Sequence, residues 1–239
     1  MQNGAKDNSN FILGAKASIP LVIGYIPIAL AFGILSKTTG ISILDSFFFS
    51  ALVFAGASQF MALNLILIGA GFGEIILTTL LVNFRHFLMS ASLAVKIEGK
   101  IKRWIPFIAF GVTDESFSVL SFREGKVTKE FTLGLQLSAY LAWVSGTVIG
   151  YLAGGILPKI ITDGMGIALY AMFAAILVPE LKKSSKILFL ALLSGGVNTL
   201  LNYLNLLPKG WNMIATIILV SFIGSYIYEE EEVKLCEQQ

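Results

Sequence analysis

Eight long apolar segments, separated by short connections rich in turn-forming residues, constrain this chain more than any other feature. A helix needs roughly 20 apolar residues to cross the hydrocarbon core of a bilayer. The stretches that reach or approach this length are residues 17–36, 46–70, 75–95, 104–122, 131–156, 164–179, 187–207 and 211–228. Backbone N–H and C=O groups find no water at that depth, so they must bond within the segment, and the alternating pattern of a transmembrane β-barrel is absent. We therefore predict an all-α, polytopic transmembrane helix bundle.

The amino-acid composition also indicates a protein that is surrounded in part by lipid. Hydrophobic residues make up 56% of the 239 residues and charged residues only 13%, whereas soluble domains carry about 25% charged residues. The net charge of +2 forms no basic face, so we expect no nucleic-acid partner. One cysteine, Cys236, and one histidine, His86, exclude an internal disulfide, a cysteine-based metal cluster and an HExxH site. We therefore expect no metal and no cofactor.

The distribution of positive charge does not fit eight simple spans. Cytoplasmic loops collect Lys and Arg, and 10 of the 17 basic residues lie in the connections 96–103, 123–129 and 182–186. These three connections lie on one side of the membrane only if segment 104–122 enters and leaves the membrane by the same face. The run Gly111-Val112-Thr113-Asp114 is typical of a helix break followed by a new N-cap.

The preferred topology therefore has about seven spans, in the range 6–8, and one re-entrant or broken element. It puts the C-terminus in the cytoplasm and the N-terminus outside. A second re-entrant segment at 46–70 is the alternative, and it would put both ends inside.

We predict one membrane domain over residues 1–239, organised as two repeats between two polar ends. Gly33-Ile34-Leu35 followed by Asp45 resembles Gly155-Ile156-Leu157 followed by Asp163, and the first helices of the two units would run in opposite directions, as inverted repeats require. Chance similarity in a chain rich in these residues is the alternative. The predicted parts are a polar N-terminal tail at 1–15, a first repeat at 16–122, a second repeat at 131–228 and an acidic C-terminal tail at 229–239.

Four ionisable side chains lie inside the apolar segments. They are Arg85 and His86 in segment 75–95, and Asp114 and Glu115 in segment 104–122. A charge at the bilayer centre costs about 2.5–3.5 kcal/mol on the mildest scales, so such residues usually mark a path for an ion or a substrate. We expect Arg85 or His86 to lie beside Asp114 or Glu115. A purely structural ion pair between two helices is the alternative.

Polar residues recur at helical spacing around these charges and predict two stripes that line a path. The first stripe is Thr79, Asn83, His86 and Ser90, and the second is Gly111, Asp114, Ser118 and Ser121. Hydrogen bonding between helices without any transport role is the alternative for the hydroxyl groups. The further polar residues Asn64, Gln136, Asn198 and Asn202 are interpreted as packing contacts.

Segment 46–70 contains the small-residue run Ala55-Gly56-Ala57-Ser58-Gln59. A helix that unwinds there would expose N–H groups at the positive end of its dipole, which suits a substrate carboxylate. Ser58 and Gln59 offer both donors and acceptors. Close packing of small residues between helices explains the same run.

Three stretches resemble the signatures of the AzlC family of branched-chain amino-acid permeases. They are Phe54-Ala55-Gly56-Ala57-Ser58-Gln59-Phe60, Val82-Asn83-Phe84-Arg85-His86 and Thr113-Asp114-Glu115-Ser116. The early residues Pro20, Pro27 and Phe32-Gly33 fit the family as well. The resemblance is most specific over residues 20–116, and in the second half it is carried by 140–150 and 173–179.

The resemblance implies a multi-pass exporter of branched-chain or related small apolar amino acids in the bacterial cell (inner) membrane. It also implies a partner, a small AzlD-type membrane subunit. Neither the substrate nor the partner follows from composition or spacing.

Our hypothesis is secondary active transport around a site where segments 46–70, 75–95 and 104–122 meet. Ser58, Gln59 and Asn83 would bind the polar groups of the amino acid. Arg85 would pair with its carboxylate or hold Asp114. Asp114 or Glu115 would bind the amino group or carry the coupling proton, with His86 as a relay. The pocket for the apolar side chain would be lined by Phe54, Phe60 and Phe87.

No GxxxxGK[ST] motif occurs in the sequence, so the energy would come from an ion gradient, here a proton gradient. A channel or a transporter for another small solute is the first alternative. A purely structural membrane subunit is another. An intramembrane hydrolase using His86 lacks a metal-ligand motif and a nucleophile elbow, so we do not expect an enzyme.

Overall fold

The computed structural model describes residues 2–98, 103–124, 127–154, 174, 177–178, 181–182, 185–204, 207 and 211–236. Most of the segment predicted at 164–179 lies outside these residues. The same holds for Gly155-Ile156-Leu157 and Asp163, on which the predicted repeat depends, and for most of the stretch 173–179. The repeat therefore stays a prediction.

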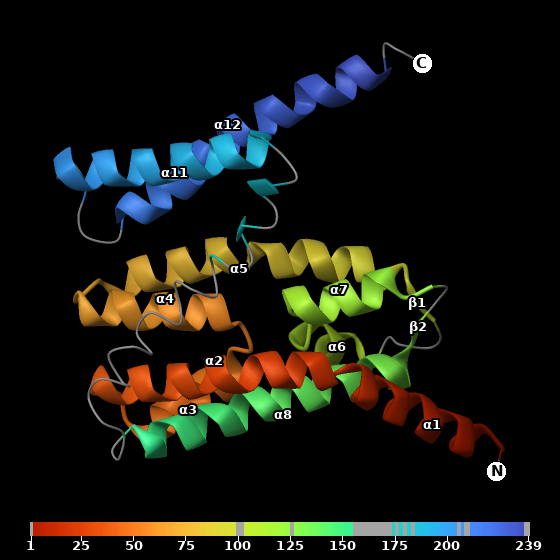
Figure 1. The fold of residues 1–239 in the computed structure, drawn as a ribbon. Coiled ribbons are helices and arrows are strands. Elements are labelled where there is room, and N and C mark those ends of the chain that lie inside the picture. Colours follow the sequence, from red (N-terminus) through yellow and green to blue (C-terminus); the bar gives the residue numbers. More distant parts are fainter. Residues whose placement is uncertain are drawn as a thin grey trace. The chain divides into compact units, whose positions relative to one another are not determined.

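The described part is helical apart from one pair of two-residue strands, so the all-α prediction is confirmed (Figure 1). The helices are α1 (Gln2–Ala17), α2 (Ile19–Thr38), α3 (Ile43–Leu52), α4 (Gly56–Leu67), α5 (Phe72–Ala94), α6 (Ile105–Phe110), α7 (Asp114–Phe122), α8 (Lys129–Ala153), α11 (Ser185–Leu204) and α12 (Trp211–Cys236). The strands are β1 (Ile97–Glu98) and β2 (Val127–Thr128). Four described helices are long and apolar enough to cross a membrane, namely α2, α5, α8 and α11. The residues predicted as a polar N-terminal tail are largely helical, in α1.

Helices α1 and α2 pack along α8 in the same direction (Figure 1). Glycines lie at the points of closest approach. A Cβ atom at Gly14 would overlap the backbone of Phe131, and one at Gly33 would overlap the carbonyl oxygen of Thr147. Because the residue numbers of both partners rise together, the helices run parallel. Membrane helices associate mainly through such close packing, since lipid is as apolar as the side chains it would replace.

Replacing Gly33 with leucine is expected to separate α2 from α8 and to destabilise the protein by about 1–3 kcal/mol or more, because a side chain cannot fit against the Thr147 carbonyl. The matched control is Gly24→Leu on the same helix, where a Cβ atom would meet nothing within 4 Å. Thermal unfolding of both variants in detergent measures the difference. Equal loss of stability in the two variants would contradict the close packing of α2 on α8.

Two of the predicted apolar segments are broken in the middle. Segment 46–70 is interrupted at residues 53–55, between α3 and α4, and segment 104–122 at residues 111–113, between α6 and α7. At the second break Thr113 caps α7: its Oγ1 accepts a hydrogen bond from the Ser116 N–H, and the Ser116 Oγ accepts one from the Thr113 N–H. This reciprocal capping box satisfies donors that a helix start leaves open. The predicted break and N-cap at 111–114 are confirmed.

The first broken element, α3 with α4, folds back on itself. The Phe32 ring of α2 contacts Phe49 of α3 and Phe60 of α4, at centroid distances of 6.2 and 5.4 Å. Across the break, the Gln59 Nε2 donates to the Ser50 Oγ at 3.0 Å. We call this element the first hairpin, and residues 53–55 its tip.

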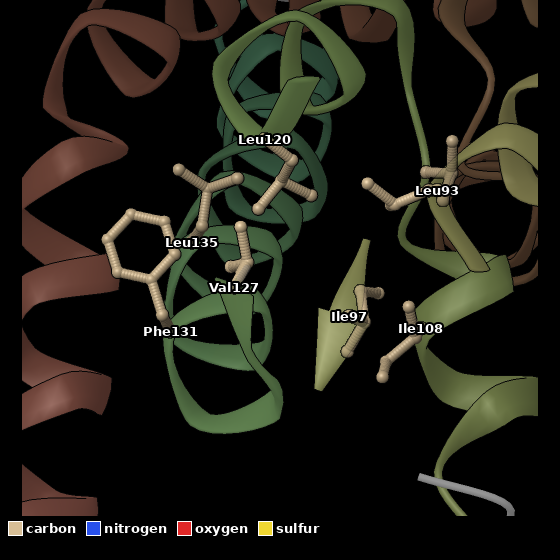
Figure 2. Packing of buried hydrophobic residues seen from close by; sticks show 8 residues of the cluster. Leu93, Ile97, Ile108, Leu120, Val127, Phe131 and Leu135 are labelled. Carbon is tan, nitrogen blue, oxygen red and sulfur yellow. The ribbon is translucent and has the colours of Figure 1, made fainter. Parts of the chain in front are cut away.

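The second broken element, α6 with α7, folds back at the opposite end of α8. Its two flanks are joined by the parallel pairing of β1 with β2, in the register Ile97 with Val127 and Glu98 with Thr128. An apolar cluster fills the space beside this pair, and Figure 2 shows its members. They include Leu93, Ile97, Ile108, Leu120, Val127 and Phe131. We call α6 with α7 the second hairpin, and residues 111–113 its tip.

Contacts with α8 show that the two hairpins enter from its opposite ends. The chain before the first hairpin lies near the end of α8, where the Tyr151 hydroxyl donates to the Ile41 carbonyl at 3.0 Å. The chain after the second hairpin lies near its start, where Arg123 stacks 4.0 Å from the Phe131 ring centroid. Segment 104–122 thus begins and ends at the same end of α8, as a re-entrant element requires, and its membrane topology stays a prediction. The preferred topology had only one such element, whereas the structure has two, as its alternative required.

Helices α11 and α12 form a separate antiparallel pair. The Asn212 Nδ2 of α12 donates to the Asn202 Oδ1 of α11 at 2.8 Å. Further along α12, Gly224 lies against Leu190, which is nearer the start of α11. Asn202 also donates to the Asn198 carbonyl at 2.8 Å. Asn202 thus makes a contact between the two helices, as predicted, whereas the contact of Asn198 lies within α11.

Candidate functional site

The tips of the two hairpins meet in a cluster of aromatic rings. Phe54 of the first tip and Phe110, directly before the second tip, have centroids 6.4 Å apart. Tyr140 of α8 packs edge-on against both, at 5.4 and 5.8 Å. Tyr25 of α2 contacts Phe54 at 6.1 Å and Trp143 of α8 at 5.5 Å. Rings at these separations and angles stabilise one another beyond their buried area, so the cluster holds the tips together.

A buried hydrogen-bond network anchors the start of α4. Gln59 is fully buried, and its Oε1 accepts a hydrogen bond from the Trp143 Nε1 at 2.9 Å. Its Nε2 donates to Ser50, whose hydroxyl is also 2.7 Å from the Thr147 hydroxyl. The predicted ligand Gln59 is therefore already engaged by protein groups on both its oxygen and its nitrogen.

Replacing Gln59 with leucine is expected to destabilise the protein by about 1–3 kcal/mol, because the buried Trp143 N–H loses its acceptor. The variant Trp143→Phe removes the donor instead. In the double variant the two losses are expected to be less than additive, since each single change already breaks the same bond. Thermal unfolding in detergent measures this coupling, and strict additivity would show that the bond does not contribute.

Helix α5 presents two polar side chains to the two hairpins. The Asn83 Nδ2 donates to the Ser58 Oγ of α4 at 3.0 Å, and Ser58 in turn donates to the Ala55 carbonyl in the first tip. The Arg85 Nη1 lies 3.0 Å from the Asp114 Oδ2, at the start of α7. The predicted pairing of Arg85 with an acid is thus present.

Two atoms of these α5 side chains are buried without a hydrogen-bond partner in the described part of the chain: the Asn83 Oδ1, an acceptor, and the Arg85 Nε, a donor. Buried polar atoms are rarely left unpaired unless a ligand or solvent completes them. The Arg85 and Asp114 side chains are also 40% and 39% exposed. The pair is therefore accessible, which a sealed structural ion pair would not be.

The other acid of the pair, Glu115, has a different partner. Its Oε2 accepts a hydrogen bond from the Tyr25 hydroxyl at 2.6 Å. The same hydroxyl is 2.7 Å from the Oγ1 of Thr113, the residue that caps α7. Tyr25 therefore joins α2 to the start of α7 through two hydrogen bonds.

The remaining predicted residues are only partly brought to the site. His86 faces the backbone of Val112 in the second tip. Gly111 lies in the tip, against the Gln136 side chain, so the predicted second stripe does not run along one helix. Of the predicted pocket residues only Phe54 is at the tips, since Phe60 packs on Phe32 and Phe87 is 66% exposed.

The sequence prediction missed Tyr25, Ser50 and Trp143. One signal for the two aromatic residues was present: tyrosine and tryptophan favour the membrane interfaces. In the middle of a span they require a partner for the hydroxyl or the indole N–H. Ser50 carries no such signal, because isolated serines are common in membrane helices.

Comparisons with known proteins show to which family the chain belongs. The family model described as AzlC protein matches residues 20–157, more than half of the chain. The chain is 39% identical to an uncharacterized membrane protein of Archaeoglobus fulgidus over 72% of its length and 76% of the relative's. It is 32% identical to the inner membrane protein YgaZ of Escherichia coli, over 81% and 82%.

It is also 30% identical to the branched-chain amino acid transport protein AzlC of Bacillus subtilis, over 71% of the chain and 67% of that protein. No solved structure matches the chain. The family match covers both hairpins, their tips and the four ionisable residues of α5 and α7. This multi-pass membrane protein therefore belongs to the AzlC family.

Proposed function

We propose that this protein is a secondary active transporter that exports branched-chain or similar small apolar amino acids. The observation that carries the proposal is the meeting of two broken helices beside an accessible ion pair, with a buried donor and a buried acceptor left over on α5. Broken helices that meet in the middle of a membrane protein are a recurring design of transporter binding sites. The name of the Bacillus relative supports the substrate class.

The chemistry of the tips suits a zwitterion. Helices α4 and α7 both begin at a tip, so the positive ends of their dipoles lie there. The carboxylate of an amino acid would bind Arg85 and the first N–H groups of α4, next to Ser58. Its ammonium group would bind Asp114 and the Asn83 Oδ1.

An apolar cavity beside the second tip suits a branched aliphatic side chain. It lies between the end of α5 and α6, and Val112 of the tip forms part of its wall. Its lining is aliphatic except for one hydroxyl, and consists of Ser90, Leu93, Ala94, Ile97, Ile105, Ile108, Ala109 and Val112. Aliphatic walls favour leucine, isoleucine or valine over polar amino acids, which would lose their hydration on entry.

The proposal includes a proton gradient as the energy source and a small AzlD-type membrane subunit as the partner. The family resemblance supports the subunit. The ionisable groups at the tips support proton coupling, because acids and histidine at this depth serve as proton relays in other transporters.

Transport by the purified protein in lipid vesicles tests the proposal. With the small subunit present, we expect labelled leucine, isoleucine and valine to cross the vesicle membrane, faster when a pH gradient is imposed. Lysine and glutamate are the matched controls, since neither fits an aliphatic cavity. Amino-acid flux that is the same with and without the pH gradient, or ion conductance without amino-acid movement, would favour a channel over a coupled transporter.

A further inference from the structure

The side-chain amide of Asn83 is held in one orientation by two linked hydrogen bonds. Its Nδ2 donates to the Ser58 Oγ at 3.0 Å, and the buried Ser58 hydroxyl donates its single proton to the Ala55 carbonyl oxygen at 2.9 Å. Because that proton is already used, Ser58 can only accept a hydrogen bond from Asn83. The amide nitrogen of Asn83 therefore points to α4, and the amide oxygen is the end that remains for a ligand.

This amide oxygen requires a hydrogen-bond donor. The Asn83 Oδ1 is buried, and it accepts no hydrogen bond from any residue that the structure describes. A carbonyl-type oxygen can only accept, so another acceptor brought against it would leave both atoms unpaired. An unpaired buried acceptor is costly, and a ligand removes that cost only if it supplies an N–H or an O–H group.

The groups next to Asn83 favour a carboxylate but do not distinguish one small carboxylic acid from another. The Arg85 Nε is a buried donor that has no acceptor within the described ranges, and α4 begins beside Ser58 with the positive end of its dipole. Asp114, the other group proposed to bind the ammonium, shares its Oδ2 with Arg85 at 3.0 Å. Recognition of the group at the α-carbon of the substrate therefore depends most on the Asn83 Oδ1.

We infer that Asn83 makes the site specific for α-amino acids over the 2-oxo acids of the same carbon skeleton, and that Ser58 is its positioning residue. A 2-oxo acid has the same carboxylate and the same aliphatic side chain, but it carries only acceptors at the α-carbon. Its oxo oxygen would lie against the Asn83 Oδ1, and neither atom could donate to the other. This inference rests on the proposed function and adds the residue that recognises the α-ammonium group.

Competition against labelled leucine tests the specificity on the unmodified protein. The full-length protein is purified in detergent with the small subunit, and the competitors are leucine, its 2-hydroxy acid and its 2-oxo acid. We expect the 2-oxo acid to bind about tenfold more weakly than leucine or worse, because the Asn83 Oδ1 stays unpaired beside it. The 2-hydroxy acid brings an O–H donor but no positive charge, so its affinity is expected to lie between the other two.

Two variants separate recognition by Asn83 from its positioning by Ser58. In Asn83→Leu the acceptor is absent, so the ratio of leucine affinity to 2-oxo acid affinity is expected to fall about tenfold through weaker binding of leucine. In Ser58→Ala the Asn83 amide is free to turn, and its Nδ2 can then donate to an oxo oxygen. The ratio is therefore expected to fall in this variant as well, but with tighter binding of the 2-oxo acid.

The matched control is Ser145→Ala, which removes a serine hydroxyl of α8 that donates to carbonyl oxygens of its own helix. Its affinity ratio is expected to equal that of the unmodified protein. A change of the ratio is a readout that a merely structural role of Ser58 would not move, since loss of folded protein lowers the binding of all three competitors together. The competitors also decide the specificity on the unmodified protein, whether or not Asn83→Leu folds.

The outcomes separate this inference from the proposed function. No binding of leucine to the unmodified protein would overturn the proposed function, and this inference with it. Equal affinities for leucine and its 2-oxo acid would overturn the inference alone. A 2-hydroxy acid that binds no better than the 2-oxo acid would show that the charge of the ammonium group is recognised, and not its hydrogen bond to Asn83. An unchanged affinity ratio in Ser58→Ala would overturn the positioning role.

Discussion

Neutralising either member of the Arg85–Asp114 pair is expected to abolish transport and to destabilise the protein, whereas neutralising both should restore stability without restoring transport. Removing one partner strands the other charge in a medium of low polarity, at a cost of about 3–5 kcal/mol when the pair is fully buried. Both side chains are about 40% exposed, so solvent screening brings the expected cost below this range. The variants are Arg85→Gln, Asp114→Asn and their combination, measured by thermal unfolding in detergent and by leucine flux in vesicles.

The double variant separates the structural role of the pair from its functional role. A pair that only locks two helices would allow transport to recover together with stability. The matched control is the pair Lys129–Glu130 at the start of α8, with an N–O distance of 3.3 Å. Its side chains are 36% and 19% exposed, but the two residues are neighbours on one helix. Neutralising both should therefore break no contact between helices and change neither measurement. Full recovery of flux in the Arg85→Gln, Asp114→Asn variant would remove the pair from the substrate site.

The sequence predicted best those features that have a local cause. The four ionisable residues were identified because charge in lipid is expensive wherever it occurs. The second break was identified because glycine followed by threonine and aspartate is a local stop-and-start signal for a helix, and Thr113 indeed caps α7. At the first break no comparable signal exists. The small residues from Ala55 to Ser58 suit a tight helix contact as well as an interrupted helix.

The features that depend on chain reversal could not be predicted in this way. The bond between Gln59 and Ser50 forms only because the first hairpin folds back, and the bond between Tyr25 and Glu115 joins residues 90 positions apart. Hydropathy gives the length of an apolar segment but not whether the segment crosses the membrane or returns. The preferred topology counted segment 46–70 as a span for that reason, and a hairpin in its place would invert every orientation before it.

That inversion leads to the second large expected effect, the labelling of single cysteines from one side of the membrane. In a Cys236→Ser background, cysteines at Ser9 and Glu124 are expected to react only from the cytoplasmic side, and a cysteine at Ser42 only from the outer side. Glu124 follows the second hairpin, next to the basic connections that mark the cytoplasm. Ser9 lies at the same end, because α1 and α8 run parallel.

The two topologies differ at two of these three positions. A single re-entrant element keeps Glu124 inside but places Ser9 outside and Ser42 inside. Two hairpins entering from opposite ends give the reverse for Ser9 and Ser42, so Glu124 serves as the common reference. Labelling of intact cells with a membrane-impermeant maleimide, before and after permeabilisation, distinguishes the two. Reaction of the cysteine at Ser9 in intact cells would show that the first hairpin crosses the membrane, and the arrangement of both tips at one substrate site would have to be abandoned.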